Sequence, residues 1–192
     1  MKIYTKRGDR GETSLLGNVS ASKAAPRVTA YGELDELNAA IGVARALGTA
    51  ASDGELDAIL AGIQSVLFEV GAELATPPGI TSKASVPIGE AEITLVEQVI
   101  DRLQAELPLQ KHFILPGGTP AAATLHLARA ICRRAERAAV ALSHQDPVDP
   151  PVLIYLNRLS DLLFVMARLA NARAGIADVA WIARRPAAPQ SS

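Results

Sequence analysis

The sequence has few of the residues on which several classes of protein depend. Its single cysteine, Cys132, excludes an internal disulfide framework and fits a reducing compartment, so we expect a cytoplasmic protein. The formal net charge is −1, so the bulk charge does not favour nucleic acid or an anionic membrane as a partner. No apolar run approaches the length of a membrane span, and the first residues lack the apolar core of a signal peptide. We therefore expect no nucleic-acid partner and no membrane partner.

Aromatic residues are also scarce, at 4% of the chain, although 49% of the residues are hydrophobic. Such an aliphatic, alanine-rich composition is typical of packed helices rather than of sheets. At 192 residues, the chain suits one domain with a sizeable core. The cations are skewed toward arginine, with 14 Arg against 5 Lys. Arginine is favoured where a planar fork must grip a carboxylate or a phosphate.

Helical periodicity and clear start and stop signals predict five long helices after residue 25. We place them at about Pro26–Leu47, from Ser52 to just before Thr76, at Gly89–Leu107, from Thr119 to about Ser143, and from Asp149 to about Gly175. Ser52 and Glu55 form a capping-box pattern, while Thr119-Pro120 and Asp149-Pro150 are typical of a cap followed by a proline at the first helical position.

The order of these helices predicts the architecture. Short connections between long helices favour antiparallel neighbours, so we predict an all-α, up-down five-helix bundle of the ferritin-like kind. Residues 1–192 then form one domain. It consists of an ordered N-terminal loop at 1–25 that can include a short extended piece, the bundle at 26–175, and a C-terminal tail at 176–192.

The N-terminal loop holds a group of residues suited to an anion. The segment 5–14, TKRGDRGETS, combines two glycines, several hydroxyls and three cations within ten residues. Glycines let backbone N–H groups approach a phosphate closely, and hydroxyls and cations complete such a cradle. The spacing is not that of a Walker A loop. Taken alone, the pattern leaves a phosphate cradle and a solvated arm open, and it favours the arm.

The helix that starts at Thr119 carries three arginines at steps of four, Arg129, Arg133 and Arg137, which we call the arginine row. This step places three guanidinium groups on one stripe of the helix, beside residues that fit a core. Like charges at that spacing are destabilising unless something anionic meets them. A phosphate clamp and a set of interhelical ion pairs are equally supported by the sequence, and Asp35 on the first helix is a candidate ion-pair partner.

Histidines and carboxylates show no metal-binding pattern. A di-iron site in a ferritin-like bundle needs Glu-x-x-His pairs, and none of the 11 glutamates has a histidine three residues on. His126, on an apolar helix, fits a hydrogen-bonded core histidine better than a metal ligand, and Cys132 fits a small buried residue. In the last helix, Asp161 and Arg168 fit interhelical or intersubunit hydrogen bonds, whereas Asn157 lies closer to a potential site.

Five motifs occur in one order along the chain. They are T-K-x-G-D-x-G-x-T near the N-terminus, A-Y-G-x-x-D-E-L-N in the first helix, F-x-L-P-G-G before the fourth, R-x-x-C-R-R-A-E-R within the fourth, and Y-L-N-R-L-S-D in the fifth. This set, which spans essentially the whole chain, resembles the PduO-type ATP:cob(I)alamin adenosyltransferases.

The resemblance implies a homotrimer with active sites between neighbouring subunits, where ATP, Mg²⁺ on its phosphates, and cobalamin bind. It implies that the nucleotide contacts are Thr5, Lys6, Arg7, Gly8, Thr13, Ser14, Lys23, Arg133, Arg134, Glu136, Arg137 and Asn157. It also implies that Asp35 and Arg129 bridge the subunit interface beside the corrinoid, and that Phe113 excludes the lower axial ligand of cobalt. Arg7 is a departure, because it stands where the family usually has threonine.

The implied reaction is transfer of the 5′-deoxyadenosyl group of ATP to cob(I)alamin, which gives adenosylcobalamin and triphosphate. Co(I) is the nucleophile, so the protein needs neither a covalent intermediate nor a general base. Arg133, Arg129, Asp35 and Phe113 are the residues implied to act in catalysis. A second hypothesis is a bundle that binds nucleotide and corrinoid as an adenosylcobalamin chaperone or sensor without turnover. The implied partner proteins are a cob(II)alamin reductase and an adenosylcobalamin-dependent enzyme.

Overall fold

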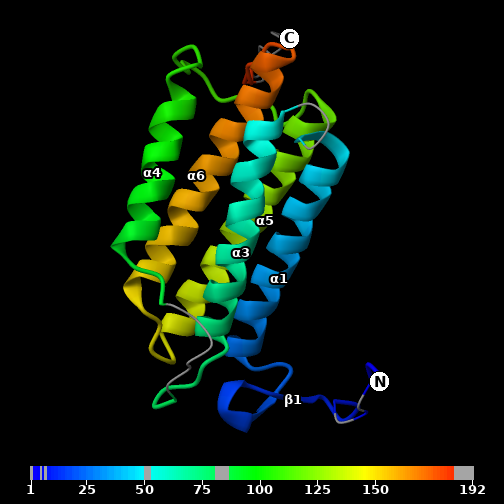
Figure 1. Ribbon diagram of the computed structural model, residues 1–192, viewed down its shortest axis with the longest axis vertical. Coiled ribbons are helices and arrows are strands. Elements are labelled where there is room, and N and C mark those ends of the chain that lie inside the picture. Colours follow the sequence, from blue (N-terminus) through cyan, green and yellow to red (C-terminus); the bar gives the residue numbers. More distant parts are fainter. Residues whose placement is uncertain (1, 5, 7, 50–52, 81–86, 184–192) are drawn as a thin grey trace, which may run out of the picture.

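Five long helices form the body of the molecule (Figure 1). The computed structural model describes residues 2–4, 6, 8–49, 53–80 and 87–183. The helices are α1 (Pro26–Ala44), α3 (Gly54–Leu74), α4 (Glu90–Gln104), α5 (Pro120–Ser143) and α6 (Pro150–Arg173), and a π-helical turn, η2 (Arg45–Thr49), continues α1. The predicted five-helix bundle is confirmed. None of the described helices is both long and apolar enough to cross a membrane.

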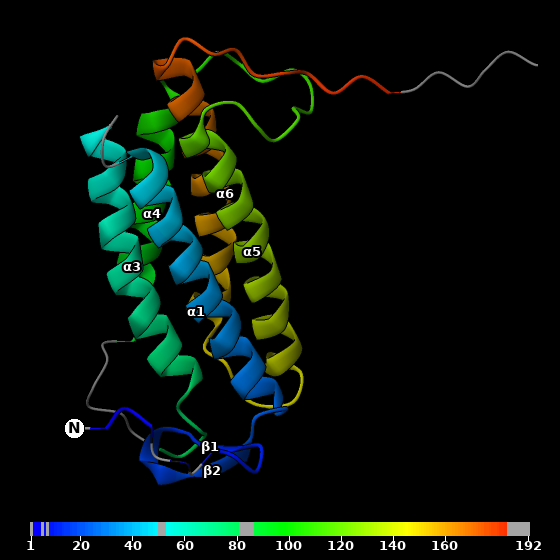
Figure 2. The same ribbon diagram turned by 90° about the vertical axis from the view of Figure 1, so that its right-hand side faces the viewer.

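Successive helices run in opposite directions, as the short connections predict (Figures 1 and 2). Helix α1 packs against α3 and α5, α5 packs against α6, and α6 packs against α4. These pairings run in the order α3, α1, α5, α6, α4, and ion pairs from Glu55 of α3 to Arg102 of α4 and Arg173 of α6 close the bundle on the remaining side. Helix α5 thus lies between two neighbours and keeps one face toward the outside.

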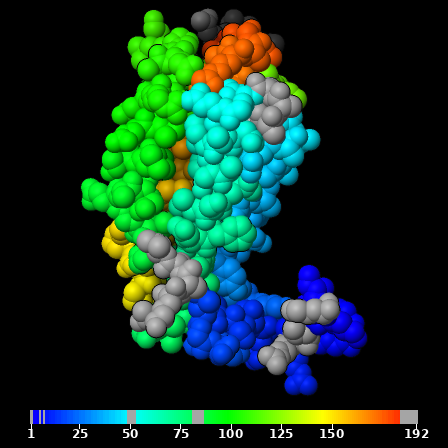
Figure 3. Space-filling model, viewed as in Figure 1, coloured from blue at the N-terminus to red at the C-terminus, as the bar shows by residue number. Residues whose placement is uncertain are grey.

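A small hairpin precedes the bundle at the end where α1 begins (Figure 2). Strands β1 (Glu12–Ser14) and β2 (Ser20–Ser22) pair antiparallel, and a 3₁₀ turn, η1 (Leu16–Asn18), lies between them. This is the extended piece for which the predicted N-terminal loop left room. Figure 3 shows the N-terminal segment extending away from the helices, so much of it is accessible to another molecule.

The core is aliphatic, as the composition predicts. Leu34, Leu37, Ile41 and Ala44, the apolar stripe of α1, are all buried. Leucine, isoleucine, valine and alanine of the other helices complete one continuous cluster with them. Burial of apolar surface stabilises the fold by about 25 cal/mol per Å², so this cluster supplies the main driving force for helix packing.

Two of the predicted cap-then-proline starts differ in chemistry. Thr119 is the N-cap of α5, and its Oγ1 accepts a hydrogen bond of 3.0 Å from the Ala122 N–H, which confirms the prediction. Asp149 stands at the N-cap of α6, but its side chain makes no capping hydrogen bond. The proline at the first helical position therefore marks that start without help from the aspartate.

The start of α3 is a correction to the predicted capping box. Ser52 lies outside the described residues, and the N-cap is Asp53, whose Oδ1 accepts from the Leu56 N–H at 3.1 Å. Glu55 forms ion pairs with Arg102 of α4 and Arg173 of α6 instead of closing a box. Tertiary ion pairs have replaced the local pattern there. Helix α4 also ends at Gln104, three residues before the predicted stop.

A buried arginine joins the segments at the hairpin end of the bundle. Arg27 is 5% exposed, and its Nε and Nη2 donate to Asp146 Oδ2 at 3.2 and 3.0 Å. Its Nη1 donates to the carbonyl oxygens of Leu74 and Thr76 at 2.8 and 3.0 Å. A buried guanidinium is tolerated only when acceptors surround it, so Arg27 fixes the ends of α3 and α5 relative to the start of α1.

A partly buried carboxyl at the same end, that of Glu73, gives a pH-dependent prediction. Burial raises the pKa of Glu73 above its ordinary value of 4.5; a hydrogen bond from the Ile88 N–H lowers it and nearby Asp149 raises it. Because the folded state then binds the proton more tightly than the unfolded state, the stability contributed by this group falls as the pH rises through the folded pKa. We expect Glu73→Gln to raise the free energy of unfolding at pH 8 by about 1 kcal/mol.

Urea unfolding at pH 8 and at pH 4 measures this effect. At the lower pH the wild-type carboxyl is largely protonated in both states, so the difference between variant and wild type should shrink. An equal difference at both pH values would mean that the charge of Glu73 is not the cause.

Candidate functional site

The arginine row lies on the outward face of α5, but its three members differ in their surroundings. Arg133 and Arg137 are exposed, whereas Arg129 is partly buried. The guanidinium carbon of Arg129 lies 5.9 Å from the centroid of the Phe164 ring, and its Nε is buried without a hydrogen-bond partner among the described residues. The row therefore offers two free cations to solvent and one cation set against an aromatic ring.

Interhelical ion pairs do form on α5, but they use a neighbouring arginine. Arg134 forms ion pairs with Glu33 and Glu36 of α1. Within the described part of the chain, Arg133 and Arg137 take part in no ion pair. The interhelical ion pairs considered for the row are thus made by Arg134, a predicted nucleotide contact outside the row. Arg133 and Arg137 remain accessible to a substrate anion.

Two predicted nucleotide contacts on different helices meet beside the row. Asn157 Nδ2 of α6 donates to Glu136 Oε1 of α5 at 3.0 Å. Arg158 Nη1 donates to Asn157 Oδ1 at 2.9 Å, and its Nε donates to Glu97 of α4 at 2.7 Å. This chain of hydrogen bonds, which runs from α4 through α6, fixes the Glu136 carboxylate on α5.

Asp35 and Arg129 do not meet within one chain. Asp35 is exposed on α1, and it has no hydrogen bond or ion pair to any of the described residues. Arg129, as described above, also lacks a partner for its Nε. A buried N–H without an acceptor costs about 1–3 kcal/mol, so this donor is suited to an acceptor from outside the chain.

The N-terminal loop is ordered by its own contacts. Lys23 Nζ donates to the Gly8 carbonyl at 2.9 Å, and the Lys23 N–H donates to the Gly11 carbonyl at 2.8 Å. Lys6 has a left-handed backbone with φ of 60°, and Ser14 is exposed. Thr13 is partly exposed, while Thr5 and Arg7 lie outside the described residues.

No hydrogen bond or ion pair between described residues joins this loop to the arginine row or to Asn157. Among the described residues, contacts within one chain therefore do not bring the two predicted halves of the nucleotide site together.

Phe113 lies at the opposite end of the bundle, on the connection from α4 to α5. Its side chain is 78% exposed. The backbone around it pairs with the segment after α6: the Trp181 N–H donates to the Phe113 carbonyl at 2.7 Å, and the Leu115 N–H donates to the Val179 carbonyl at 2.8 Å. A large apolar side chain held outward by paired backbone is suited to contact a ligand or a second subunit.

The Pro116-Gly117-Gly118 turn after Phe113 is held by a residue that the sequence analysis did not name. Asn171 of α6 is 3% exposed; its Oδ1 accepts from the Thr119 N–H at 2.9 Å and its Nδ2 donates to the Gly117 carbonyl at 3.0 Å. Gly118 has φ of +104°, and a Cβ there would lie 2.1 Å from Asn171 Oδ1, so glycine is required. A second asparagine, after Asn157, in this largely apolar helix was the available signal.

No group of three or more histidine, cysteine or acidic side chains that could hold a metal ion occurs within the described ranges.

A comparison with protein families shows to which family the chain belongs. The sequence model described as Cobalamin adenosyltransferase matches residues 3–170, which is most of the chain. The chain belongs to the cobalamin adenosyltransferase family. Every described motif of the site, from the N-terminal loop to Asn157, lies within the matched range.

Relatives within the family are similar over nearly their whole length. The corrinoid adenosyltransferase of Bacillus subtilis is 46% identical over 182 residues, which cover 94% of this chain and 92% of the relative. That of Mycobacterium tuberculosis (strain H37Rv) is 44% identical over 185 residues, with 94% and 92% covered. A solved variant of the Lactobacillus reuteri PduO-type ATP:corrinoid adenosyltransferase, complexed with cobalamin and ATP, has a TM-score of 0.89 and 41% identity, with 94% and 96% covered.

The cysteine and the histidine of α5 are both buried in this member of the cobalamin adenosyltransferase family. Cys132 is fully buried, its Sγ donates to the Leu156 carbonyl at 3.3 Å, and burial raises the pKa of its thiol, so it is inert as a nucleophile. His126 is 4% exposed, and burial lowers its pKa. The expected hydrogen-bonded core histidine is wrong in one respect, because both ring nitrogens lack a partner among the described residues.

Proposed function

We propose that this protein transfers the 5′-deoxyadenosyl group of ATP to cob(I)alamin and releases triphosphate. The observation that carries the proposal is the pair of exposed cations Arg133 and Arg137, which have no ion pair among the described residues and lie beside the Glu136–Asn157 hydrogen bond, in a chain of this family. Preorganised cations stabilise charge that develops on a leaving group, and triphosphate is such a group.

The reaction requires no covalent bond between the protein and its substrates. The Co(I) electron pair forms a bond to the ribose 5′ carbon while the bond from that carbon to the triphosphate oxygen breaks, and the electrons of that bond leave with triphosphate. No proton transfer is needed, which fits the inert state of Cys132. Holding the reactants in line supplies up to about 7–11 kcal/mol of the barrier reduction in favourable cases.

We propose that the nucleotide site is completed by a neighbouring subunit of a homotrimer. The N-terminal loop and the arginine row have no described contact within one chain, so a loop from a second subunit would supply Lys6, Gly8, Thr13, Ser14 and Lys23. Thr5 and Arg7 belong to the same loop by sequence. Arg134 would contribute mainly by fixing α5 to α1.

The same assembly would satisfy the unpaired side chains near the corrinoid. We propose that Asp35 of one subunit meets Arg129 of another, because each is without an ion-pair partner among the described residues of its own chain. Phe113, exposed on the connection from α4 to α5, would occupy the position of the lower axial ligand of cobalt. Mg²⁺ would be held on the phosphates of ATP and would offset their charge.

The cellular setting follows from this function. We propose that the whole chain acts as one domain in the cytoplasm, with 1–25 as the ATP loop. A cob(II)alamin reductase would supply the electron, and an adenosylcobalamin-dependent enzyme would receive the product.

A turnover assay tests the proposal directly. The protein is incubated with ATP, Mg²⁺ and chemically reduced cob(I)alamin while the corrinoid absorption spectrum is followed. We expect adenosylcobalamin to form catalytically, and light scattering should give a mass of three chains. Tight binding of both molecules without product above the uncatalysed background would instead support the chaperone or sensor hypothesis.

A further inference from the structure

We infer that Arg168 is a positioning residue for Phe113. It acts as a clasp that holds residues 176–181, the first part of the C-terminal tail and called the tail from here on, against the loop of residues 108–118. The inference rests on the proposed role of Phe113 beside the corrinoid. Arg168 lies near the end of α6 and is 6% exposed. A guanidinium so deeply buried needs acceptors for its N–H groups, so its partners reveal which segments it holds.

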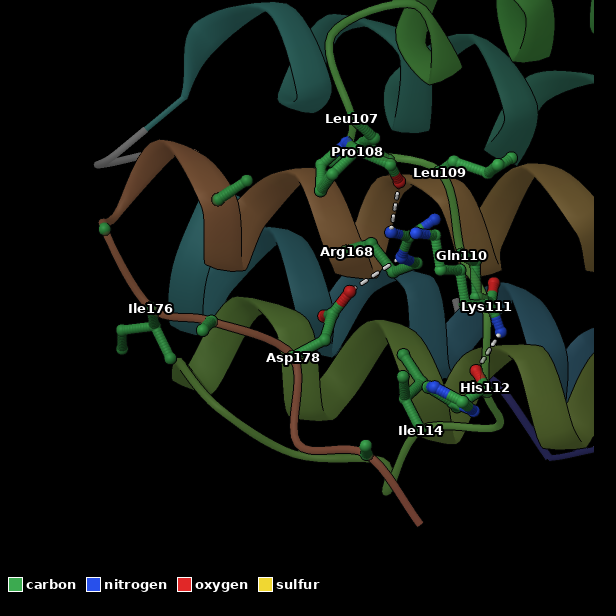
Figure 4. Close-up of a pocket in the computed structure, with 14 residues that line it drawn as sticks. Leu107, Pro108, Leu109, Gln110, Lys111, His112, Ile114, Arg168, Ile176 and Asp178 are labelled. Atoms are coloured by element: carbon green, nitrogen blue, oxygen red, sulfur yellow. Dashed lines mark hydrogen bonds and ion pairs between the residues drawn. The ribbon is translucent and has the colours of Figure 1, made fainter.

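The two partners of Arg168 come from the two segments that meet at Phe113. Its Nε donates to Asp178 Oδ2 of the tail at 2.7 Å, and its Nη2 donates to the Pro108 carbonyl at the start of the loop at 3.0 Å. Figure 4 shows the guanidinium between these two groups, with one dashed line to each. One buried side chain therefore fixes the separation of loop and tail.

The tail in turn fixes the backbone of Phe113. Residue Ile114 pairs with Ala180 in an antiparallel bridge, and hydrogen bonds on either side link Phe113 to Trp181 and Leu115 to Val179. The Phe113 side chain is largely exposed, so packing on its own chain does little to hold it. Its position depends on this short backbone ladder, and the ladder depends on the tail being in place.

A pocket beside the loop leaves hydrogen bonds from α6 as an important means of holding the loop in place. A pocket of about 540 Å³ opens between the loop, the end of α6 and the tail, and its lining includes His112, Ile114, Arg168 and Asp178 (Figure 4). Because the loop bridges a pocket, it lacks a continuous core below it. Asn171 holds the far end of the loop at the Gly-Gly turn, and Arg168 holds the near end and the tail.

The first test measures the tail without any catalysis. Trp181 is the single tryptophan of the chain, so its fluorescence reports the tail alone. We expect Arg168→Met, which keeps an unbranched apolar stem but removes the guanidinium, to increase acrylamide quenching of Trp181. It should also speed amide hydrogen exchange at Leu115 and Trp181, while the far-UV CD spectrum stays helical. Unchanged quenching and exchange would overturn the clasp.

The second test measures the consequence for Phe113. With cob(II)alamin and a mild reductant, we expect Arg168→Met to lose about tenfold to a hundredfold in rate, as misplacement of a group can do. With supplied cob(I)alamin, the loss of rate should be several times smaller. The absorption spectrum of cob(II)alamin bound to the variant should show that a larger fraction retains its lower axial ligand. Equal losses with both corrinoids would overturn the positioning role.

Arg173→Met is the matched control. Arg173 lies on the same helix, and its ion pairs join Asp53, Glu55 and Glu106, but it has no hydrogen bond to the loop or the tail. Its replacement should lower thermal stability without changing Trp181 quenching or the ratio of the two rates. The same changes in this control as in Arg168→Met would overturn the inference.

A second variant covers a loss of folding. If Arg168→Met does not fold, Asp178→Asn removes only the charge of the tail residue that pairs with Arg168. Trp181 quenching, amide exchange and the ratio of the two rates then test the inference with that variant. If the wild type forms no adenosylcobalamin, the proposed function fails, while Trp181 quenching still decides whether the clasp exists.

Discussion

Replacing Arg133 by alanine is expected to lower kcat/KM for ATP by about 10²–10³-fold, the usual effect of removing one preorganised group that stabilises developing charge. Arg133 is exposed and has no ion pair within the described residues, so no interaction of the fold is lost. The midpoint of thermal unfolding should therefore stay within a few degrees of the wild-type value, because surface substitutions usually change stability by less than about 0.5 kcal/mol. Steady-state kinetics and CD melting measure the two effects.

Two further variants separate the clamp from simple charge. Arg133→Lys keeps the charge but loses the planar fork, so it should recover only part of the activity. Arg102→Ala removes another exposed arginine, one that pairs with Glu55 far from the row, and should leave the kinetics unchanged. A collapsed fold with unchanged nucleotide affinity in Arg133→Ala would instead favour a structural role for the arginine.

Phe113→Ala should affect the two corrinoid substrates unequally. If the ring fills the place of the lower ligand, its loss lets that ligand return and makes Co(I) harder to generate. We expect a loss of about tenfold or more with cob(II)alamin and a mild reductant, where each tenfold corresponds to about 1.4 kcal/mol of barrier. The loss should be smaller with supplied cob(I)alamin, because reduction has then already taken place. Parallel assays with the two substrates measure the ratio.

The chain offers a close control for this substitution. Phe68 of α3 is 72% exposed, against 78% for Phe113, so truncating either ring removes a similarly exposed apolar group. Phe68→Ala should leave both rates unchanged, and both variants should melt near the wild-type temperature. Equal losses with the two corrinoids in Phe113→Ala would rule out exclusion of the lower ligand as its role.

Local sequence patterns predicted the helices well. They failed where a side chain pairs with residues of another helix instead of with its own helix end. Thr119 caps α5 as its sequence indicates, because the capping hydrogen bond reaches only three residues along the chain. Glu55 was expected to close a capping box, but it pairs with Arg102 and Arg173 from other helices. A pattern within four residues cannot report an ion pair that forms only after helices pack.

In the candidate site, too, some features follow from local spacing and others only from helix packing. The spacing of the arginine row fixes that three guanidinium groups share one stripe of α5, because helical geometry alone places them there. Which arginine receives a protein carboxylate depends on the packing of α1 against α5, and the packing gives Glu33 and Glu36 to Arg134. Arg133 was thereby left free for a substrate.

The sequence by itself determined the five helices, their order and the residue types of the site, because periodicity, caps and motifs are local properties of the chain. Only the tertiary structure decided how Phe113 is presented. Arg168 and Asn171 lie three residues apart on α6, yet they hold opposite ends of a loop more than 50 residues away in the chain. Contacts over such separations depend on how the helices pack, so no pattern within one helix could reveal them.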